Sequence, residues 1–301
     1  MIAKALIIIN NRKKLPEIFN HLIKDLLNHF GEDNCTIAPT EYYKHSIELA
    51  RMSASKNIDI IFAIGGDGTF NEVINGILDT GKTNIKLCLI PNGTGNDFCR
   101  AENIKYTPNC IIPALKRSEF ANCDVGLATQ SDKKRYFLNI LDIGFGGCAT
   151  LLLDRQRKLG IKGNLSYSIA ILRTFFYFKK PIVTITTEGI ERYAGKLMML
   201  AACNGSTFAN GLIIFPGAKP NDEKLGFALL GDVTLWDYLR NIGNLKKGVR
   251  IKHKNITYFE GSSISIKIND GLAPIETDGE VFGFGDCDVS IIPNAISILK
   301  Y

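Results

Sequence analysis

A carboxylate stands in a turn whose other residues suit the binding of an anion. Residues 65–69 read GGDGT and follow an apolar run containing Ile61 and Ile64, which indicates a buried strand. Three glycines allow close backbone approach, and the amides of a helix N-terminus attract a phosphate. Asp67 makes chemical sense beside a phosphate if it acts on a proton, a hydroxyl or a metal ion. The alternative is an ordinary strand-to-helix turn that Thr69 caps.

A second polar loop follows the next buried strand. Residues 91–97 read PNGTGND and offer the amides and hydroxyls that bind phosphates. Two such loops after neighbouring strands could hold one triphosphate. The sequence therefore predicts that both loops belong to one binding site.

A third glycine-containing motif points elsewhere. Residues 76–83 read GILDTGKT and fit the P-loop pattern GxxxxGK[ST]. A true P-loop follows a strand and opens a helix. Here a helix precedes the motif and a strand follows it, so Gly81 is better explained as the residue that ends the helix.

Two other groups of carboxylates lie later in the chain. Asp278 and Glu280 flank a glycine in an otherwise apolar stretch. They form either a solvated hairpin turn or a base or magnesium ligand of a kinase site, since phosphoryl transfer uses both. Asp222 and Glu223 follow Asn221 in another turn. That turn is either a charged surface turn or, with backbone carbonyls, a site for a hard cation.

Strands and helices alternate over the first part of the chain. Strands are expected at 5–9, 35–39, 58–64 and 86–90, and helices after Pro16, over 43–55 and over 69–79. This order predicts a parallel, doubly wound sheet. Both glycine-rich loops then lie at its carboxyl edge, where ligands bind in open α/β sheets.

The pattern changes after about residue 125. Strand-like runs with glycine turns dominate, and one helical stretch covers 164–178, which predicts an antiparallel sandwich or a partly closed barrel. We expect an α/β domain over 1–125 and a mainly antiparallel β domain over 126–294. Residues 295–301, with a strand at 295–299, are expected to pack back on the first domain.

Composition narrows the class of protein. The chain has 301 residues, a net charge of +6 and eight cysteines without a CxxC pair. No apolar run reaches the roughly 18 residues of a membrane span, and the first apolar stretch is too short for a signal peptide. We therefore expect a cytoplasmic protein with buried cysteines. The basic residues follow no nucleic-acid-binding motif, so no nucleic acid is expected as a partner.

The motifs together resemble a known family. GGDGTFNEVING followed by IPNGTGNDF is similar to the diacylglycerol kinase catalytic domain, in the superfamily of sphingosine and ceramide kinases. CNGSTFANG, AKPNDEKL and TDGE extend the similarity to the soluble bacterial lipid kinases. GGDGT also occurs in NAD kinases and, as a variant, in phosphofructokinases. The resemblance covers nearly the whole chain. It implies an α/β nucleotide domain, a C-terminal β-sandwich and an active site in the cleft between them.

The resemblance implies a role for each motif. Asp67 would lie near the γ-phosphate of ATP and Mg²⁺. Glu280 matches the proposed proton acceptor, with Asp278 beside it, and either Asp67 or Glu280 would be the base. The residues implied for ATP binding are Thr40, Gly65, Gly66, Asp67, Gly68, Thr69, Asn71, Glu72, Asn92, Gly93, Thr94, Gly95, Asn96 and Asp97. The residues implied for a structural magnesium site are Asp222 and, through their carbonyls, Lys219 and Lys224.

The chain departs from the family pattern in three places. Where the family has a phosphate loop with proline and glycine, residues 10–15 read NNRKKL. Without a glycine this segment has to offer side chains instead of close backbone approach. Its candidate contacts are Asn10, Asn11, Arg12, Lys13 and Lys14. Glu223 replaces a glycine after the metal aspartate, and the turn FANG is poorer in glycine than its counterparts.

The segment ILRTFFYFKK at 171–180 has two interpretations. Its aromatic and basic residues suit an anionic membrane interface. Aromatic residues at helical spacing are, however, usually buried, which favours a core helix that ends in solvated lysines.

The resemblance implies an ATP- and magnesium-dependent lipid kinase, most simply one that converts diacylglycerol to phosphatidic acid. The first alternative is a kinase of phosphatidylglycerol, a sphingoid base or NAD. The second is a nucleotide-binding regulator without catalysis, which the glycine-free NNRKKL suggests. A lipid acceptor implies peripheral association with a membrane, and a homodimer is one assembly that we consider.

Overall fold

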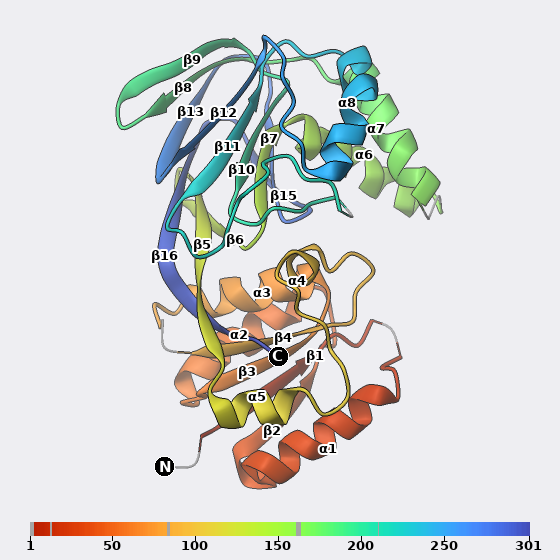
Figure 1. Cartoon of the computed structure of the whole chain (residues 1–301), viewed down its shortest axis with the longest axis vertical. Helices are drawn as coiled ribbons and strands as arrows, with labels where there is room; N and C mark the ends of the chain where they lie inside the picture. Colours follow the sequence, from red (N-terminus) through yellow and green to blue (C-terminus); the bar gives the residue numbers. More distant parts are fainter. Residues whose placement is uncertain (1–2, 13, 83–84, 161–163, 210) are drawn as a thin grey trace. The chain divides into compact units, whose positions relative to one another are not determined.

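The chain forms two compact units (Figure 1). The computed structural model describes residues 3–12, 14–82, 85–160, 164–209 and 211–301. Unit 1 contains Met1–Val125 and Pro293–Tyr301, and unit 2 contains Gly126–Ile292.

A parallel sheet lies at the centre of unit 1, which confirms the predicted fold class. Its strands run in the order β2 (Cys35–Pro39), β1 (Ala5–Ile9), β3 (Ile60–Gly65) and β4 (Lys86–Pro91). The end of β16 (Cys287–Leu299) continues the sheet, because Ser297 and Ile298 pair in parallel with β4. β1 and β3 are buried along their whole length. Their continuous apolar sequences follow from this burial on both faces.

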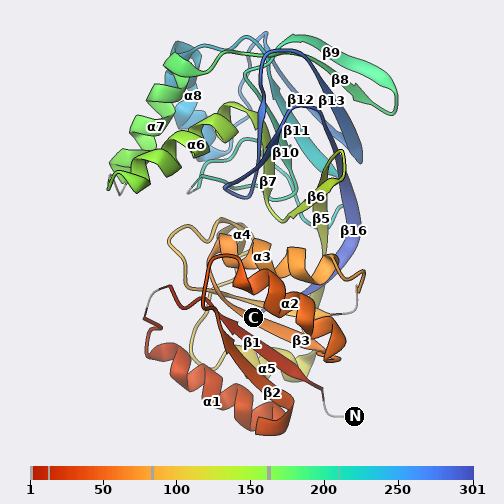
Figure 2. The same cartoon turned by 180° about the vertical axis from the view of Figure 1, so that it is seen from behind.

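Helices cover both faces of this sheet (Figures 1 and 2). α1 (Ile18–Phe30) and α5 (Ile111–Arg117) bury a cluster that includes Ile7, Phe62 and Ile90. α2 (His45–Ser55) and α3 (Asp67–Leu78) pack on each other and on the opposite face. The shorter helices of the unit are η1 (Glu32–Asn34) and α4 (Asp97–Ala101). α3 begins two residues earlier than its apolar spacing predicted, so Asp67 belongs to its first turn.

The P-loop match lies in the reversed context that the sequence predicted. Gly76 belongs to α3, and Gly81, with φ of +72°, lies beyond the end of that helix. The strand β4 then begins at Lys86. Thr83 lies outside the described residues. The described residues of the motif therefore end a helix instead of opening one, which is not the arrangement of a P-loop.

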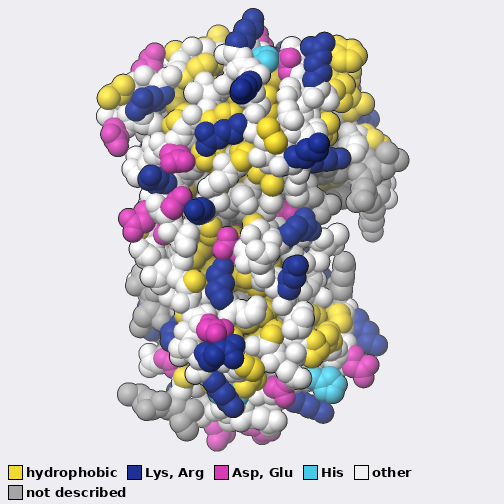
Figure 3. All heavy atoms as spheres, in the orientation of Figure 1, with side chains coloured by type: hydrophobic (Ala, Val, Ile, Leu, Met, Phe, Trp, Pro, Cys, Tyr) yellow, Lys and Arg dark blue, Asp and Glu magenta, His cyan; other side chains and the backbone are white. Residues whose placement is uncertain are grey.

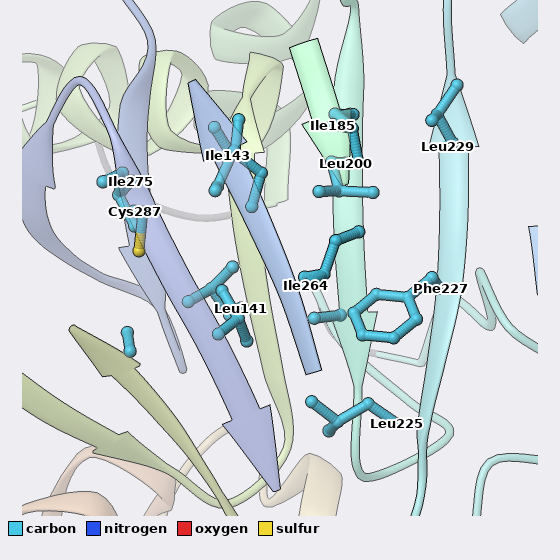
Figure 4. Packing of buried hydrophobic residues seen from close by; sticks show 14 of the residues in the cluster. Leu141, Ile143, Ile185, Leu200, Leu225, Phe227, Leu229, Ile264, Ile275 and Cys287 are labelled. Atoms are coloured by element: carbon cyan, nitrogen blue, oxygen red, sulfur yellow. The ribbon is translucent and has the colours of Figure 1, made fainter. Parts of the chain in front are cut away.

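Unit 2 is an antiparallel sandwich, one of the two predicted architectures. One layer is β12 (Ile256–Gly261), β11 (Leu225–Leu230), β10 (Met199–Cys203), β7 (Ile140–Gly144), β14 (Pro274–Thr277) and β15 (Glu280–Phe284). The other contains the first part of β16, with β13 (Ser263–Asp270), β8 (Ile182–Thr187), β9 (Ile190–Lys196), β5 (Phe120–Gln130) and β6 (Lys133–Phe137). Side chains of both layers form one core, in which Leu141, Leu200 and Phe227 lie near Ile185 and Ile264 (Figure 4).

The described residues of unit 2 form three helices beside the strands, where the sequence predicted one. α7 (Asn164–Tyr177) matches the expected helical stretch, but α6 (Phe145–Lys158) and α8 (Leu235–Lys247) were not predicted. α8 has a local signal that could have been found: Thr234 and Asp237 form a capping box, and Gly248 ends the helix with φ of +63°. No helix in the described part of the chain is long and apolar enough to cross a membrane.

Candidate active site

The first glycine turn joins β3 to α3. Gly66 is the N-cap of α3 and Thr69 lies within the helix, so Thr69 does not cap it. A Cβ atom on Gly65 would lie 2.4 Å from Thr69 Oγ1, so packing within the turn requires this glycine. A Cβ atom on Gly68, in contrast, would meet no atom within 4 Å. Contacts within the described chain therefore account for a glycine at position 65. They do not account for the glycine at position 68, beside which the space is open.

The second loop closes directly on the first. The amide of Asn92 donates to the carbonyl of Gly65 at 2.6 Å. A Cβ atom on Gly93 would lie 2.6 Å from the Cα atom of Gly66, so the two loops meet backbone to backbone. Asn96, with φ of +51°, fixes the second loop by two 3.0 Å hydrogen bonds between its side chain and the backbone of Gly93. The structure therefore brings the two predicted loops together.

Two carboxylates flank Gly95 in this loop pair. A Cβ atom built on Gly95 would lie 3.0 Å from Asp67 Oδ2 and 3.9 Å from Asp97 Oδ2. Asp67 Oδ1 accepts a hydrogen bond from the amide of Phe98 at 3.3 Å. Asp97 forms a 3.2 Å ion pair with Arg100, whose guanidinium also donates to the carbonyl of Gly95. The sequence analysis did not single out Arg100, although it lies three residues after a predicted aspartate.

The ends of β1 and β2 reach the same edge of the sheet. Asn10 Nδ2 donates to Thr69 Oγ1 at 2.7 Å, and the amide of Asn11 donates to Thr40 Oγ1 at 3.1 Å. The predicted residues of three strand ends therefore gather at one place. Arg12 is exposed, and its guanidinium lies 5.0 Å from the ring centre of Tyr43.

The remaining residues predicted to bind the nucleotide differ in burial. Lys14 and Thr94 are exposed, whereas Asn71 and Glu72 are buried within α3. Lys13 lies outside the described residues. Asn71 Oδ1 accepts a hydrogen bond from Asn75 Nδ2 at 3.1 Å, one turn further along α3.

In unit 2, Asp278 is held by backbone amides. Its carboxylate accepts hydrogen bonds from the amides of Leu138 at 2.7 Å, Asn139 at 2.9 Å and Ile140 at 3.0 Å. Asp278 also adopts a φ of +48°, which is uncommon for a residue other than glycine. With both oxygens bonded to amides, the side chain fixes the TDGE turn to the start of β7.

Asn204 of the CNGST motif supports the same backbone segment. Its side chain is fully buried and donates from Nδ2 to the carbonyl of Leu138 at 2.7 Å. Its own amide donates to the carbonyl of Asn139 at 2.9 Å. The motif therefore fixes the segment that offers its amides to Asp278. Asn210 of the later FANG turn lies outside the described residues.

Glu280 is paired with an arginine that the sequence analysis missed. Its Oε2 atom lies 3.0 Å from Arg135 Nη2, and both side chains are largely buried, with 23% and 13% of their surface exposed. The two residues are 145 positions apart, so no local pattern links them. The TDGE turn thus gives its two carboxylates different surroundings: amides for Asp278 and a guanidinium for Glu280.

A second carboxylate pair lies beside this turn. Glu276 on β14 is directly opposite Asp142 on β7, and it accepts a hydrogen bond from the amide of Gly279. Asp142 is 1% exposed, and its Oδ2 atom has no hydrogen-bond partner among the described residues. Burial raises the pKa of Asp142 to about 7. Burial and the charge of Asp142 raise the pKa of Glu276 to about 8.

The Asp142→Asn variant is expected to be more stable than the native protein at neutral and higher pH. Because burial raises the pKa of Asp142 in the folded state, its carboxyl stabilises the fold at low pH, and this stability is lost as pH rises through about 7. Asparagine remains neutral, so its advantage should grow between about pH 4 and pH 8, by about 4 kcal/mol for a pKa raised from 3.8 to about 7. Thermal unfolding at both pH values measures it.

Asp132→Asn is the control for this prediction, because Asp132 is an exposed aspartate of the same unit. It should shift the midpoint equally little at both pH values. An Asp142→Asn effect that does not change with pH would contradict a raised pKa.

The candidate cation site is an exposed turn. Asp222 is exposed, and its Oδ1 atom accepts a hydrogen bond from the amide of Lys224 at 3.2 Å. Glu223 has a φ of +62°, a conformation that suits the glycine of the family pattern. Carboxylate and carbonyl oxygens are the donors that Mg²⁺ prefers. No cluster of three or more His, Cys, Asp or Glu residues suited to a metal occurs in the described part of the chain.

An α/β unit with a parallel sheet and a second unit that is an antiparallel β-sandwich make up a NAD-kinase-like fold. An Archaeoglobus fulgidus NAD kinase in complex with ATP shares this fold, with a TM-score of 0.53 at 13% identity, over 99% of this chain and 93% of that one. Residues 4–128 match the diacylglycerol kinase catalytic domain, and residues 140–300 match the YegS C-terminal NAD kinase beta sandwich-like domain. The second match covers more than half of the chain, so the chain belongs to the YegS family, and the first match gives it a diacylglycerol kinase catalytic domain. The protein is therefore a kinase, a phosphotransferase with an alcohol acceptor.

Individual relatives agree with this assignment. A Staphylococcus haemolyticus protein named "Putative lipid kinase" is 27% identical over 86% of this chain and 82% of its own length. The crystal structure of a "putative diacylglycerol kinase" from Bacillus anthracis superposes with a TM-score of 0.76 at 22% identity. That match covers 99% of this chain and 97% of the other. The similarity therefore spans both units.

Proposed function

We propose that the protein transfers the γ-phosphate of ATP to a lipid hydroxyl, with diacylglycerol as acceptor and phosphatidic acid as product. The observation that carries the nucleotide half of this proposal is Gly68. Glycine destabilises a helix relative to alanine by up to about 1 kcal/mol, and the space beside Gly68 is open. A phosphate that approaches this backbone explains why a glycine stands there.

The residues of unit 1 provide the surroundings of the phosphates. The backbone amides in the first turn of α3 attract an anion, and Asp67 belongs to that turn. In this proposal Asp67 acts beside the γ-phosphate and Thr94 contacts ATP. Arg100 holds Asp97 and the Gly95 carbonyl in place. Thr40 and Asn10 fix the strand ends behind these loops.

In this proposal the TDGE turn provides the group that acts on the lipid acceptor. Glu280 takes the proton of the lipid hydroxyl, because Asp278 already accepts three amide hydrogen bonds. Asp278 is the positioning residue in this proposal. Asp142 and Glu276 lie behind the same turn, and Glu276 binds the amide of Gly279 next to Glu280.

Magnesium fits the oxygen donors of this chain. Asp67 would hold the ion at the phosphates, where Mg²⁺ neutralises charge during phosphoryl transfer. Asp222 and the carbonyls of Lys219 and Lys224 would hold a structural ion. In the same proposal residues 1–125 with 295–301 bind the nucleotide, and residues 126–294 contribute Glu280.

A transfer assay with labelled ATP and magnesium tests the function. The acceptors are detergent-dispersed diacylglycerol, phosphatidylglycerol, sphingosine and soluble NAD. We expect label in diacylglycerol, lost in the Glu280→Gln variant and kept in Glu188→Gln, an exposed glutamate of the same unit. Label in phosphatidylglycerol or sphingosine instead would identify that lipid as the acceptor. Label in NAD alone would overturn the lipid proposal. ATP binding without transfer to any acceptor would indicate a regulator.

A further inference from the structure

One face of α7 exposes large apolar side chains to solvent. Leu172, Phe176 and Tyr177 are 48%, 75% and 72% exposed. Their spacing, together with that of Arg173, places them on one side of the helix. Ala170 and Thr174 are buried on the other side. The helix is therefore anchored by one face and presents an aromatic and basic face outward.

The neighbouring helix α8 has a similar exposed face. Trp236 is 69% exposed and Leu239 is 48% exposed. Arg240 follows at the next position, and Lys246 and Lys247 lie two turns further on. All five are exposed at a helical spacing that puts them on one side, while Leu245 is buried.

The two helices that bear these faces are neighbours in unit 2. The rings of Phe175 on α7 and Tyr238 on α8 lie 5.4 Å apart, and Phe175 also packs 4.5 Å from Phe145. Both helices lie on the same side of the sandwich (Figures 1 and 2). Hydrophobic and basic side chains lie next to each other at the α8 edge (Figure 3). We call Leu172, Phe176, Tyr177, Trp236 and Leu239, with their basic neighbours, the α7–α8 surface.

Each of the two interpretations of the segment 171–180 holds for some of its aromatic residues. Phe175 and Phe178 pack against Phe145, as a core helix requires. Phe176 and Tyr177 do not follow this pattern, because more than two thirds of each side chain is exposed. Contiguous exposed apolar side chains on a folded protein mark an interaction site.

The charges of the α7–α8 surface indicate its partner. α7 contains no acidic residue, and the single one of α8, Asp237, serves in the capping box. The exposed charges on the two helices are Arg173, Arg240, Lys246 and Lys247, with Lys179 just beyond α7. A second copy placed on this surface would oppose basic residues to basic residues. An anionic lipid headgroup layer complements them, and Trp and Tyr prefer the membrane–water interface.

We propose that the α7–α8 surface docks the protein on an anionic phospholipid bilayer, with Phe176, Tyr177 and Trp236 inserted at headgroup depth. This inference rests on the proposed function in one respect: docking on a membrane serves the protein because its proposed acceptor is a membrane lipid. The docking itself requires neither nucleotide nor catalysis. It can therefore be measured separately.

The single tryptophan of the chain, Trp236, reports this docking directly. Without nucleotide, vesicles of equal parts phosphatidylcholine and phosphatidylglycerol should shift its emission to shorter wavelength. Brominated phosphatidylglycerol should quench it, whereas pure phosphatidylcholine vesicles should have little effect. The Phe176→Ser variant should bind the anionic vesicles at least about tenfold more weakly, the loss expected for one buried phenyl ring. Ile190→Ser, which changes a 60% exposed side chain on β9, should bind like the native protein.

Three results of the binding measurements would overturn the inference. The first is vesicle binding without any change of Trp236 emission, and the second is equal weakening by Phe176→Ser and Ile190→Ser. The third is an emission shift that depends on protein concentration without lipid, which would assign the surface to self-association. A shift without phosphoryl transfer would contradict only the proposed function. Transfer to vesicle-bound diacylglycerol by Phe176→Ser at the native rate would contradict only the docking surface.

Discussion

The Asp67→Asn variant is expected to transfer the γ-phosphate roughly a thousandfold more slowly than the native protein. Asp67 stands in the first turn of α3, and one of its oxygens lies beside Gly95 in the second loop. Asparagine keeps an acceptor for the amide of Phe98, so the loops should keep their geometry. Only the negative charge and the capacity to hold a proton or a cation are lost. Single-turnover transfer with saturating ATP measures the effect.

The control for this variant is Asp33→Asn, which removes an exposed carboxylate of the same unit. It should transfer phosphate at the native rate. ATP affinity of Asp67→Asn should change much less than its rate, because the amides that attract the phosphates remain. A rate within about tenfold of the native one would remove Asp67 from the catalytic machinery, since positioned charges contribute more than this.

The first unit could be predicted from the sequence because its signals are local. β1, β3 and β4 are apolar runs, and the turns after β3 and β4 contain the glycines and the asparagine that their close approach needs. That the two loops share one edge of the sheet followed from the alternation of strands and helices, since parallel strands end at the same edge. Their direct backbone contact is visible only in the structure.

The carboxylate surroundings in unit 2 could not be predicted in the same way. The partners of Glu280 and Asp278 lie about 140 positions earlier in the chain, on β6 and just before β7. Asp142 faces Glu276 only through the register of β7 and β14. The two carboxylates of TDGE flank Gly279 and could not be told apart by spacing, but three backbone amides bind Asp278 whereas Arg135 pairs with Glu280. Contacts of this kind depend on the tertiary structure and have no pattern in the local sequence.

The Gly93→Ala variant is expected to destabilise unit 1 and to lose ATP binding. Its new methyl group would lie 2.6 Å from the Cα atom of Gly66 and 2.7 Å from the side-chain oxygen of Asn96. Backbone cannot yield at low cost, so the second loop has to move away from the first. Such overpacking costs about 2 kcal/mol. Thermal unfolding and ATP titration of the purified variant measure the two effects.

Gly68→Ala in the same pair of loops is the matched comparison, and it should separate stability from binding. Its methyl group would meet no atom of the described chain, and alanine favours the helix, so the unfolding midpoint should stay the same or rise. If a phosphate occupies the open space, ATP affinity should nonetheless fall at least about tenfold, or about 1.4 kcal/mol of binding free energy. Native ATP affinity in a stabilised Gly68→Ala protein would show that this glycine serves no ligand. The phosphates would then lie further from the first turn of α3. Asp67 would no longer lie beside the γ-phosphate on which it is proposed to act.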